Sequence, residues 1–300
     1  MRHFLIAFFF LTPLAAHAAS PEANYFASRD RYIDTFKPRE RNVDVSELAL
    51  KQEEKARSDL ERKIRLIVGE HKIQGFPGQG KINLETLFSG DLGFGLLDGL
   101  IYTSADDKTH VIVTTRSVFD HWLREHAHWW DGGAKIANVP QQADAALRSE
   151  AFYTQALNTD AAVFKYVEFP ITKPAGSSMV FAMLAARGQD IGPTTPNELL
   201  LALVQRDRIF VISAPANTPM VPIPACQRIW DDAEQKAVRA QDAYIASDPR
   251  DQKLFKQGNH YREEGAAAFH HCYAQQAKNQ EAFAVLTRQA QVLANTILAK

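Results

Sequence analysis

The chain has 300 residues, of which 46% are hydrophobic and 23% are charged. This length and composition allow one or two domains with a sizeable core, and they exclude a globally disordered chain. The 34 lysine and arginine residues nearly balance the 35 acidic residues, which gives a formal net charge of −1. Because nucleic-acid binders need a basic face, we expect no nucleic-acid partner.

The first 18 residues have the pattern of a secretory signal peptide. Arg2 is followed by an apolar stretch over residues 4–14, and the tripeptide at residues 16–18 supplies the small side chains that precede a cleavage site. We therefore expect cleavage after Ala18 and export to the periplasm; a membrane anchor or a buried N-terminal strand is the alternative. No later apolar run, such as that over residues 199–204, is long enough to cross a bilayer, so we expect no transmembrane segment.

Residues 19–75 are expected to form a polar arm followed by one helix. The charged stretch up to residue 45 predicts a loosely ordered arm. Ser46 can cap a helix that runs to about Gly69, because apolar side chains then recur at helical spacing.

Residues 76–222 predict a domain in which strands and helices are mixed. We expect strands over residues 81–88, 100–103, 110–115, 163–171, 179–186, 199–204 and 209–214. Helices are expected over residues 118–130 and 142–157. Short connections favour antiparallel neighbours, and strict strand–helix alternation is absent. The expected fold class is α+β, with a central antiparallel sheet and flanking helices.

Residues 223–300 are rich in alanine, glutamine, lysine and leucine, which predicts helices. Two apolar stripes at helical spacing run through this region. The first comprises Cys226, Ile229, Trp230, Ala233, Ala237, Ala240 and Tyr244, and the second comprises Phe283, Leu286, Ala290, Leu293 and Ile297. We expect both stripes to pack helix on helix.

The two cysteines, Cys226 and Cys272, predict a disulfide that staples an antiparallel helical hairpin. Residues that face each other in such a hairpin lie equally far from its turn, and the midpoint of the two cysteines is Pro249. Asp248 followed by Pro249 is a helix-start signal, so the turn falls where the disulfide requires it. The alternative is a pair of buried thiols. A catalytic disulfide is not expected, because the Cys-X-X-Cys motif is absent.

The segment over residues 120–131 is rich in histidine and tryptophan. On a helix, His121, Glu125 and His128 stand at positions i, i+4 and i+7, so they can present three metal ligands in a row. The His-Glu-x-x-His and His-x-x-Glu-His patterns of zinc proteases are absent. The alternative is a solvated helix face that binds no metal.

Three tryptophans in the same segment indicate a candidate binding surface. Trp129 and Trp130 point about 100° apart on a helix, so they do not easily join Trp122 in one core stripe. An exposed tryptophan beside Arg124 suits contact with a protein or a glycan. The alternative is that these rings only fill the core.

The Gly-x-Ser-x-Gly motif of serine hydrolases is absent, and we expect no cofactor. We therefore expect a non-enzymatic periplasmic protein that binds another protein of the cell envelope, for example as an inhibitor or an immunity-type protein. One alternative is a metal-dependent periplasmic hydrolase that uses His121, Glu125 and His128. The other is an envelope assembly factor whose helical hairpin mediates oligomerisation. The partner, any substrate and the oligomeric state stay open.

Overall fold

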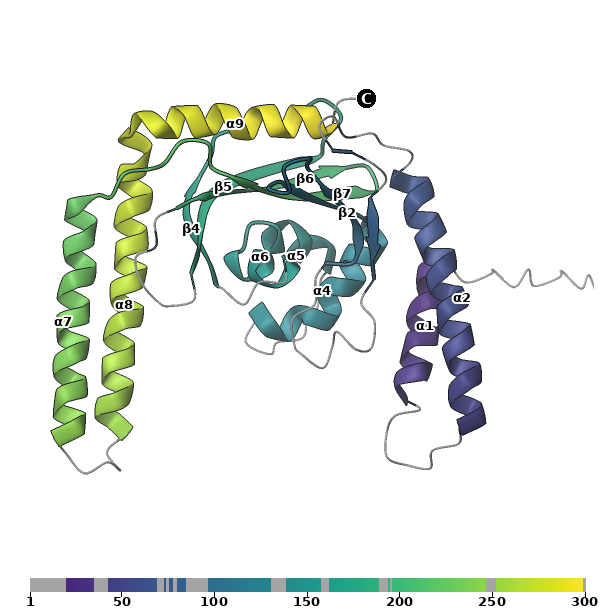
Figure 1. Cartoon of the computed structure of the whole chain (residues 1–300), viewed down its shortest axis with the longest axis horizontal. Coiled ribbons are helices and arrows are strands. Elements are labelled where there is room, and N and C mark those ends of the chain that lie inside the picture. The colour runs from purple at the N-terminus through teal and green to yellow at the C-terminus, as the bar shows by residue number, and fades with distance from the viewer. Residues whose placement is uncertain are drawn as a thin grey trace, which may run out of the picture. The chain divides into compact units, whose positions relative to one another are not determined.

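The computed structural model describes residues 20–34, 43–68, 73, 76–77, 80–84, 97–130, 139–157, 162–188, 194, 196–246 and 252–298. The chain divides into two compact units, Met1–Leu60 and Glu61–Lys300. Figure 1 shows the helices and strands of both units. The expected signal peptide lies outside the described residues, so its cleavage after Ala18 stays a prediction.

The first unit contains α1 (Pro21–Asp34) and most of α2 (Val43–Val68). The helix expected in the second half of this region is present as α2. The expectation of a loosely ordered arm is wrong for the residues of α1. The start of α1 is encoded locally, because the hydroxyl of Ser20 accepts a hydrogen bond from the amide of Ala23 at 3.2 Å and Pro21 begins the helix.

A seven-stranded sheet is the centre of the second unit, and its fold class is α+β as the sequence predicts. The strands are β1 (Lys81–Asn83), β2 (Gly99–Thr103), β3 (His110–Thr115), β4 (Ala162–Glu168), β5 (Met179–Gly188), β6 (Glu198–Gln205) and β7 (Arg208–Pro215). They lie in the order β1-β2-β3-β7-β6-β5-β4. Every neighbouring pair is antiparallel, which agrees with the short connections.

Three helices cover one face of this sheet: α4 (Arg116–Trp130), α5 (Val139–Ala146) and α6 (Glu150–Ala156) (Figure 1). The core that they share with the sheet includes Phe119, Trp122, Leu123, Leu147, Phe152, Phe181, Leu200 and Val211. The single helix expected over residues 142–157 is wrong, because the chain breaks between α5 and α6. At the break, the hydroxyl of Tyr153 donates to the carbonyl oxygen of Leu147 at 3.0 Å and so satisfies a backbone acceptor.

Helix α9 (Glu281–Leu298) lies against the opposite face of the sheet, where it contacts β6 (Figure 1). Its buried stripe consists of Leu286, Ala290, Ala294 and Ile297. The expectation that this stripe packs on another helix is therefore wrong. A spacing of three and four residues determines which side of a helix is apolar, but it does not determine what covers that side. Because helices cover both faces, the central strands are continuous apolar runs.

Side-chain amides of three glutamines fasten neighbouring loops to the α9 region. The amide of Gln291 accepts a hydrogen bond from the backbone N–H of Thr172 at 2.7 Å and donates one to its carbonyl oxygen at 3.0 Å. Likewise, the amide of Gln289 accepts from the backbone N–H of Asn217 and donates to the carbonyl oxygen of Pro215. The amide of Gln280 accepts from the backbone N–H of Val221 and donates to its carbonyl oxygen. Each amide thus satisfies one backbone donor and one backbone acceptor, as a neighbouring strand would.

Helices α7 (Pro224–Ala246) and α8 (Gln252–Gln276) form the expected antiparallel hairpin (Figure 1). A disulfide joins Cys226 and Cys272, with 5.5 Å between their Cα atoms. The disulfide and the hairpin are both confirmed.

The pairing across the hairpin has the register that the sequence predicts. Gly265 packs against Ala233, and Gly258 packs against Ala240. Each of these pairs has the same midpoint in the sequence as the two cysteines, at position 249. Successive contacts are therefore seven residues apart, which is the spacing of a coiled-coil seam.

The hairpin meets the sheet at β4. The ring of Tyr166 lies 4.8 Å from that of Tyr273 and 6.2 Å from that of Phe269, measured between centroids. Away from this joint, α7 and α8 pack chiefly on each other. In Figure 1 the end of α7 and the start of α8 lie well away from the sheet.

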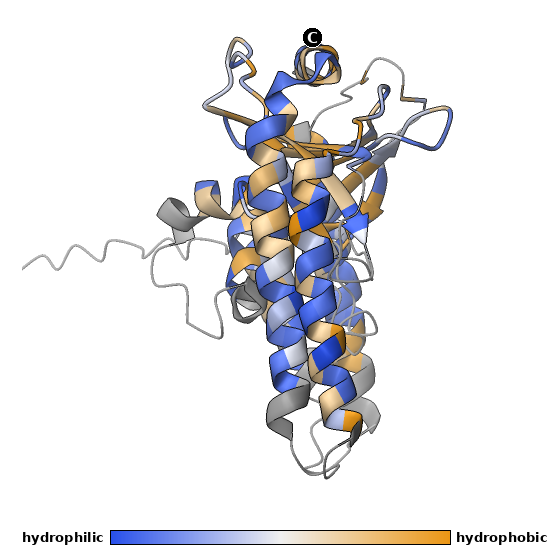
Figure 2. Cartoon of the chain, turned by 90° about the vertical axis from the view of Figure 1, so that its left-hand side faces the viewer, coloured by the Kyte–Doolittle hydropathy of each residue, from blue (hydrophilic) through white to orange (hydrophobic). Residues whose placement is uncertain are grey.

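Polar residues occupy much of the surface of the hairpin, as Figure 2 shows. Orange segments also occur on the helices, so apolar residues are not confined to the joint with the sheet. Within the ranges that the structure describes, no helix combines the length and the apolar character needed to cross a bilayer.

Candidate functional site

The histidine- and tryptophan-rich segment folds as helix α4, as expected. The hydroxyl of Thr115 caps its start by accepting a hydrogen bond from the amide of Val118 at 3.3 Å. Trp122 is 1% exposed, and its ring meets Phe152 edge to face at 5.7 Å. The indole of Trp122 is therefore part of the core between α4 and α6.

The other side chains singled out on α4 are only partly within the described residues. Arg124 is exposed, and His121 is partly buried. The side chains of Glu125, His128, Trp129 and Trp130 lie outside the description. Among the side chains that are described, no group of three His, Cys, Asp or Glu is placed to hold a metal ion. The metal site and the tryptophan binding surface on α4 stay predictions.

The interface between α7 and α8 is a narrow seam of alanine and glycine. Ala233, Ala237 and Ala240 of α7 are buried at 9%, 0% and 7% exposure, opposite the glycines of α8. A Cβ placed on Gly265 meets the Cβ of Ala233 at 2.2 Å, a distance at which two carbon atoms overlap. The helices can approach this closely only because residue 265 has no side chain.

We expect Gly265→Ala to lower the free energy of unfolding by about 1–3 kcal/mol, because the added methyl group must push the two helices apart. Gly258→Ala is the matched control. Its Cβ meets the carbonyl oxygen of Ala237 at 3.4 Å and the Cβ of Ala240 at 3.9 Å, which are ordinary contacts. This control should be neutral or gain up to about 1 kcal/mol of helix propensity. Urea unfolding of both variants measures the difference, and equal effects would contradict the close approach at residue 265.

A bidentate ion pair also crosses the seam. Arg262 donates through Nε and Nη2 to the two carboxylate oxygens of Glu234, each at 2.9 Å. The hydrogen bond from Arg262 lowers the pKa of Glu234 below its usual value. Both side chains are about one third exposed, at 29% and 35%, so we assign the pair only about 0.2–1 kcal/mol. Its fork geometry fixes the rotation of one helix against the other.

The face of α7 that points away from α8 is exposed. Val238 is 43% exposed and Ile245 is 71% exposed. A groove of about 390 Å³ on this side is lined by Trp230, Asp231, Glu234, Gln235, Val238 and Arg239. The sequence interpretation placed Trp230 in the seam and gave the residues between the seam positions no role. The sequence spacing does indicate this second side of α7, since residues seven apart, such as Val238 and Ile245, share one side of a helix.

A second hollow, of about 230 Å³, lies where α8 meets β4. In it the imidazole of His270 lies 4.9 Å from the ring of Phe164 and 5.1 Å from that of Tyr166. Burial lowers the pKa of His270 and raises that of Tyr166 above its usual value. Burial also raises the pKa of Tyr273 to about 12. All three groups are thus held in their neutral forms near pH 7, and they act as an aromatic joint between hairpin and sheet.

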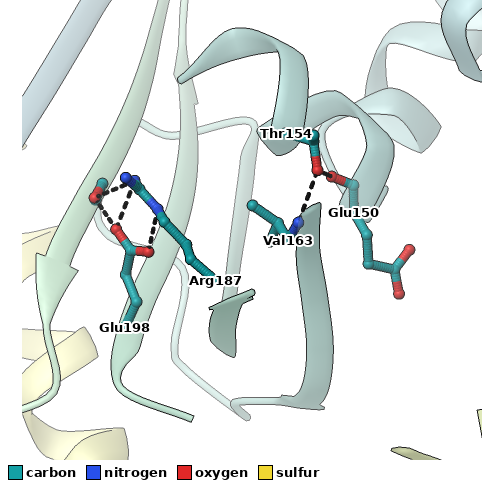
Figure 3. Close-up of polar contacts among 6 residues, drawn as sticks. Glu150, Thr154, Val163, Arg187 and Glu198 are labelled. Carbon is teal, nitrogen blue, oxygen red and sulfur yellow. Dashed lines mark hydrogen bonds and ion pairs between the residues drawn. The ribbon is translucent and has the colours of Figure 1, made fainter. Parts of the chain in front are cut away.

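Glu198 and Arg187, on neighbouring strands, form the most extensive polar cluster drawn in Figure 3. The Nε atom of Arg187 lies 2.6 Å from Oε2 of Glu198, and its Nη2 atom lies 2.8 Å from Oε1. The hydroxyl of Ser213 donates to the same carboxylate and accepts from Nη2 of Arg187 at 3.2 Å. Ser213 is 3% exposed, so a substrate cannot reach its hydroxyl. The cluster joins three strands and offers no nucleophile.

Thr154 makes the other contact in Figure 3. Its hydroxyl accepts a hydrogen bond from the amide of Val163 at 2.9 Å and donates one to the carbonyl oxygen of Glu150 at 3.1 Å (Figure 3). This contact fastens α6 to the outer edge strand β4. An edge strand with occupied backbone groups is less open to pairing with another chain.

No family model, no curated protein and no solved structure matches this chain.

Proposed function

We propose that this chain is an exported, non-enzymatic protein that binds another protein of the cell envelope, and that the α7–α8 hairpin is its contact element. One observation carries the proposal. The hairpin is long, packs chiefly on itself, is fixed by a disulfide and exposes apolar side chains on its outer face.

The hairpin contributes little to the core of the sheet. Among the described residues, the end of α8 near Phe269 and Tyr273 packs on β4. The seam of alanine and glycine buries small side chains, so at about 25 cal/mol per Å² it yields little hydrophobic stabilisation. A long helical pair that adds little to the core, yet is held rigid, is suited to presenting a surface.

Rigidity before binding favours affinity. The disulfide and the pair between Glu234 and Arg262 hold the two helices in one arrangement, so little conformational entropy is lost when a partner docks. Val238 and Ile245 provide apolar area on the outer side of α7. Single exposed apolar residues are ordinary on protein surfaces. The proposal uses the fact that Val238 and Ile245 occur together on this hairpin.

Export is part of the proposal. The first 18 residues have the pattern of a signal peptide. The disulfide between Cys226 and Cys272 is compatible with an oxidising compartment such as the periplasm. The proposed protein partner would lie in the same compartment as the exported chain.

The test is site-specific photo-crosslinking in the exported, full-length protein. A photo-reactive residue replaces Ile245, near the loop end of α7, or Ala267, which is exposed on α8. Illumination is expected to give one discrete product that contains a second, different protein.

The matched control position is Val292, which is 61% exposed on α9. It should give no such product. Equal crosslinking at all three positions, or none at the two hairpin positions, would contradict the proposal. A product that contains two copies of this chain reports self-association and is scored separately.

A further inference from the structure

The outer face of α7 is centred on Gln235, directly opposite the alanine–glycine seam. At about 100° per residue, Arg228, Asp231, Arg239 and Asp242 all lie within about 40° of Gln235 around the helix axis. All five residues are exposed. Four charged residues of α7 therefore lie on the side that α8 does not cover.

These charges are mirrored about Gln235 with opposite sign. Seven residues before and after it stand Arg228 and Asp242, and four residues before and after it stand Asp231 and Arg239. A helix that meets an identical helix in antiparallel orientation, with Gln235 at the centre, brings mirrored positions face to face. The pattern is thus self-complementary for that one arrangement.

We propose that this face of α7 binds the same face of a second copy of the chain, antiparallel and about a two-fold axis near Gln235. The inference rests on the proposed role of the hairpin as the contact element. In this dimer Arg228 faces Asp242 of the second copy and Asp231 faces Arg239 of the second copy. Because each contact occurs twice in a two-fold interface, four ion pairs form.

Other orientations are less favourable. A parallel contact in the same register would place Asp231 opposite Asp231 and Arg239 opposite Arg239, so like charges would meet. Val238 borders the charged positions and supplies apolar area, beside the groove of about 390 Å³. Oppositely charged residues three apart, such as Arg228 and Asp231, can also pair within one helix. The experiment below distinguishes ion pairs between two copies of the chain from ion pairs within one helix.

The dimer is expected to be weak and sensitive to salt. Its ion pairs are exposed, and exposed pairs are screened by solvent and ions. A contact between single helices is also small compared with a standard protein interface, so the dissociation constant should be on the order of micromolar or weaker.

The test is sedimentation equilibrium of the purified, oxidised, mature protein over a wide concentration range. Asp231→Arg and Arg239→Asp should each raise the dissociation constant about tenfold or more, because symmetry turns two attractive pairs into two repulsive pairs. An equimolar mixture of the two variants should associate again, since its heterodimer restores both pairs. The double variant Asp231→Arg, Arg239→Asp should also dimerise. Pairing within one helix does not predict rescue in the mixture.

Arg288→Asp is the control for the change in net charge, since Arg288 is exposed on α9. It should leave the dissociation constant unchanged. A wild-type protein that stays monomeric at the highest concentration, or variants whose mixture fails to associate, would overturn the inference. This experiment uses the purified chain alone, so its failure leaves the crosslinking result on Ile245 and Ala267 intact. If the crosslinking fails, sedimentation equilibrium can still show whether the purified chain forms the dimer.

Discussion

Replacing both Cys226 and Cys272 with alanine is expected to lower the free energy of unfolding by about 4 kcal/mol, from the chain-entropy estimate for a closed loop of this length. The two residues are 46 positions apart in the sequence. The loss should appear first in the hairpin, because the alanine–glycine seam buries too little apolar area to replace the crosslink. Urea unfolding of the variant and of the oxidised wild type gives the difference.

Reduction of the wild-type protein is the control, and it should reproduce most of the same loss. Hydrogen exchange should show faster opening of α7 and α8, with the amides of β5 to β7 less affected. The prediction would be contradicted if the variant and the wild type unfold at the same urea concentration. Two reactive thiols in denatured, unreduced protein from the periplasm would contradict the disulfide itself.

The hairpin is the part of the fold that the sequence predicts best. Helical spacing and the position of two cysteines are local or pairwise properties, whereas the start signal at Asp248-Pro249 lies outside the described residues. Together they determine the register of α7 against α8, and the contact of Gly265 with Ala233 confirms it. The strands are predicted for a similar reason, since short connections between apolar runs leave few pairings other than antiparallel ones.

The elements that were missed depend on neighbours that lie far away in the sequence. The stripe of α9 is apolar on the expected side, yet a sheet covers it and not a helix. At the break between α5 and α6, the hydroxyl of Tyr153 satisfies the carbonyl oxygen of Leu147. The spacing of apolar residues in the sequence identifies neither the sheet that covers α9 nor the carbonyl oxygen that Tyr153 contacts.

The unusual residue types of the sequence lie on α4, and they indicate that helix as the candidate site. The mirrored charges of α7 are equally visible in the sequence, which also predicts that the apolar stripe on the opposite side of this helix packs against α8. Asp231 and Arg239 are common surface residues, so their residue types alone do not indicate an interface.

Trp122→Ala is expected to lower the free energy of unfolding by about 3–5 kcal/mol, the usual cost of removing a large aromatic side chain from a core. Trp122 is 1% exposed, and its ring packs against Phe152 at 5.7 Å, so truncation leaves a cavity between α4 and α6. Arg124→Ala, on the exposed side of the same helix, is the matched control and should change stability by less than about 0.5 kcal/mol. Urea unfolding compares the two. If both variants unfold like the wild type, Trp122 does not hold α4 to the core and its ring is available for a partner. If only Trp122→Ala is unstable, a loss of binding in that variant cannot be assigned to a direct contact, and tests of α4 as a surface must use Arg124.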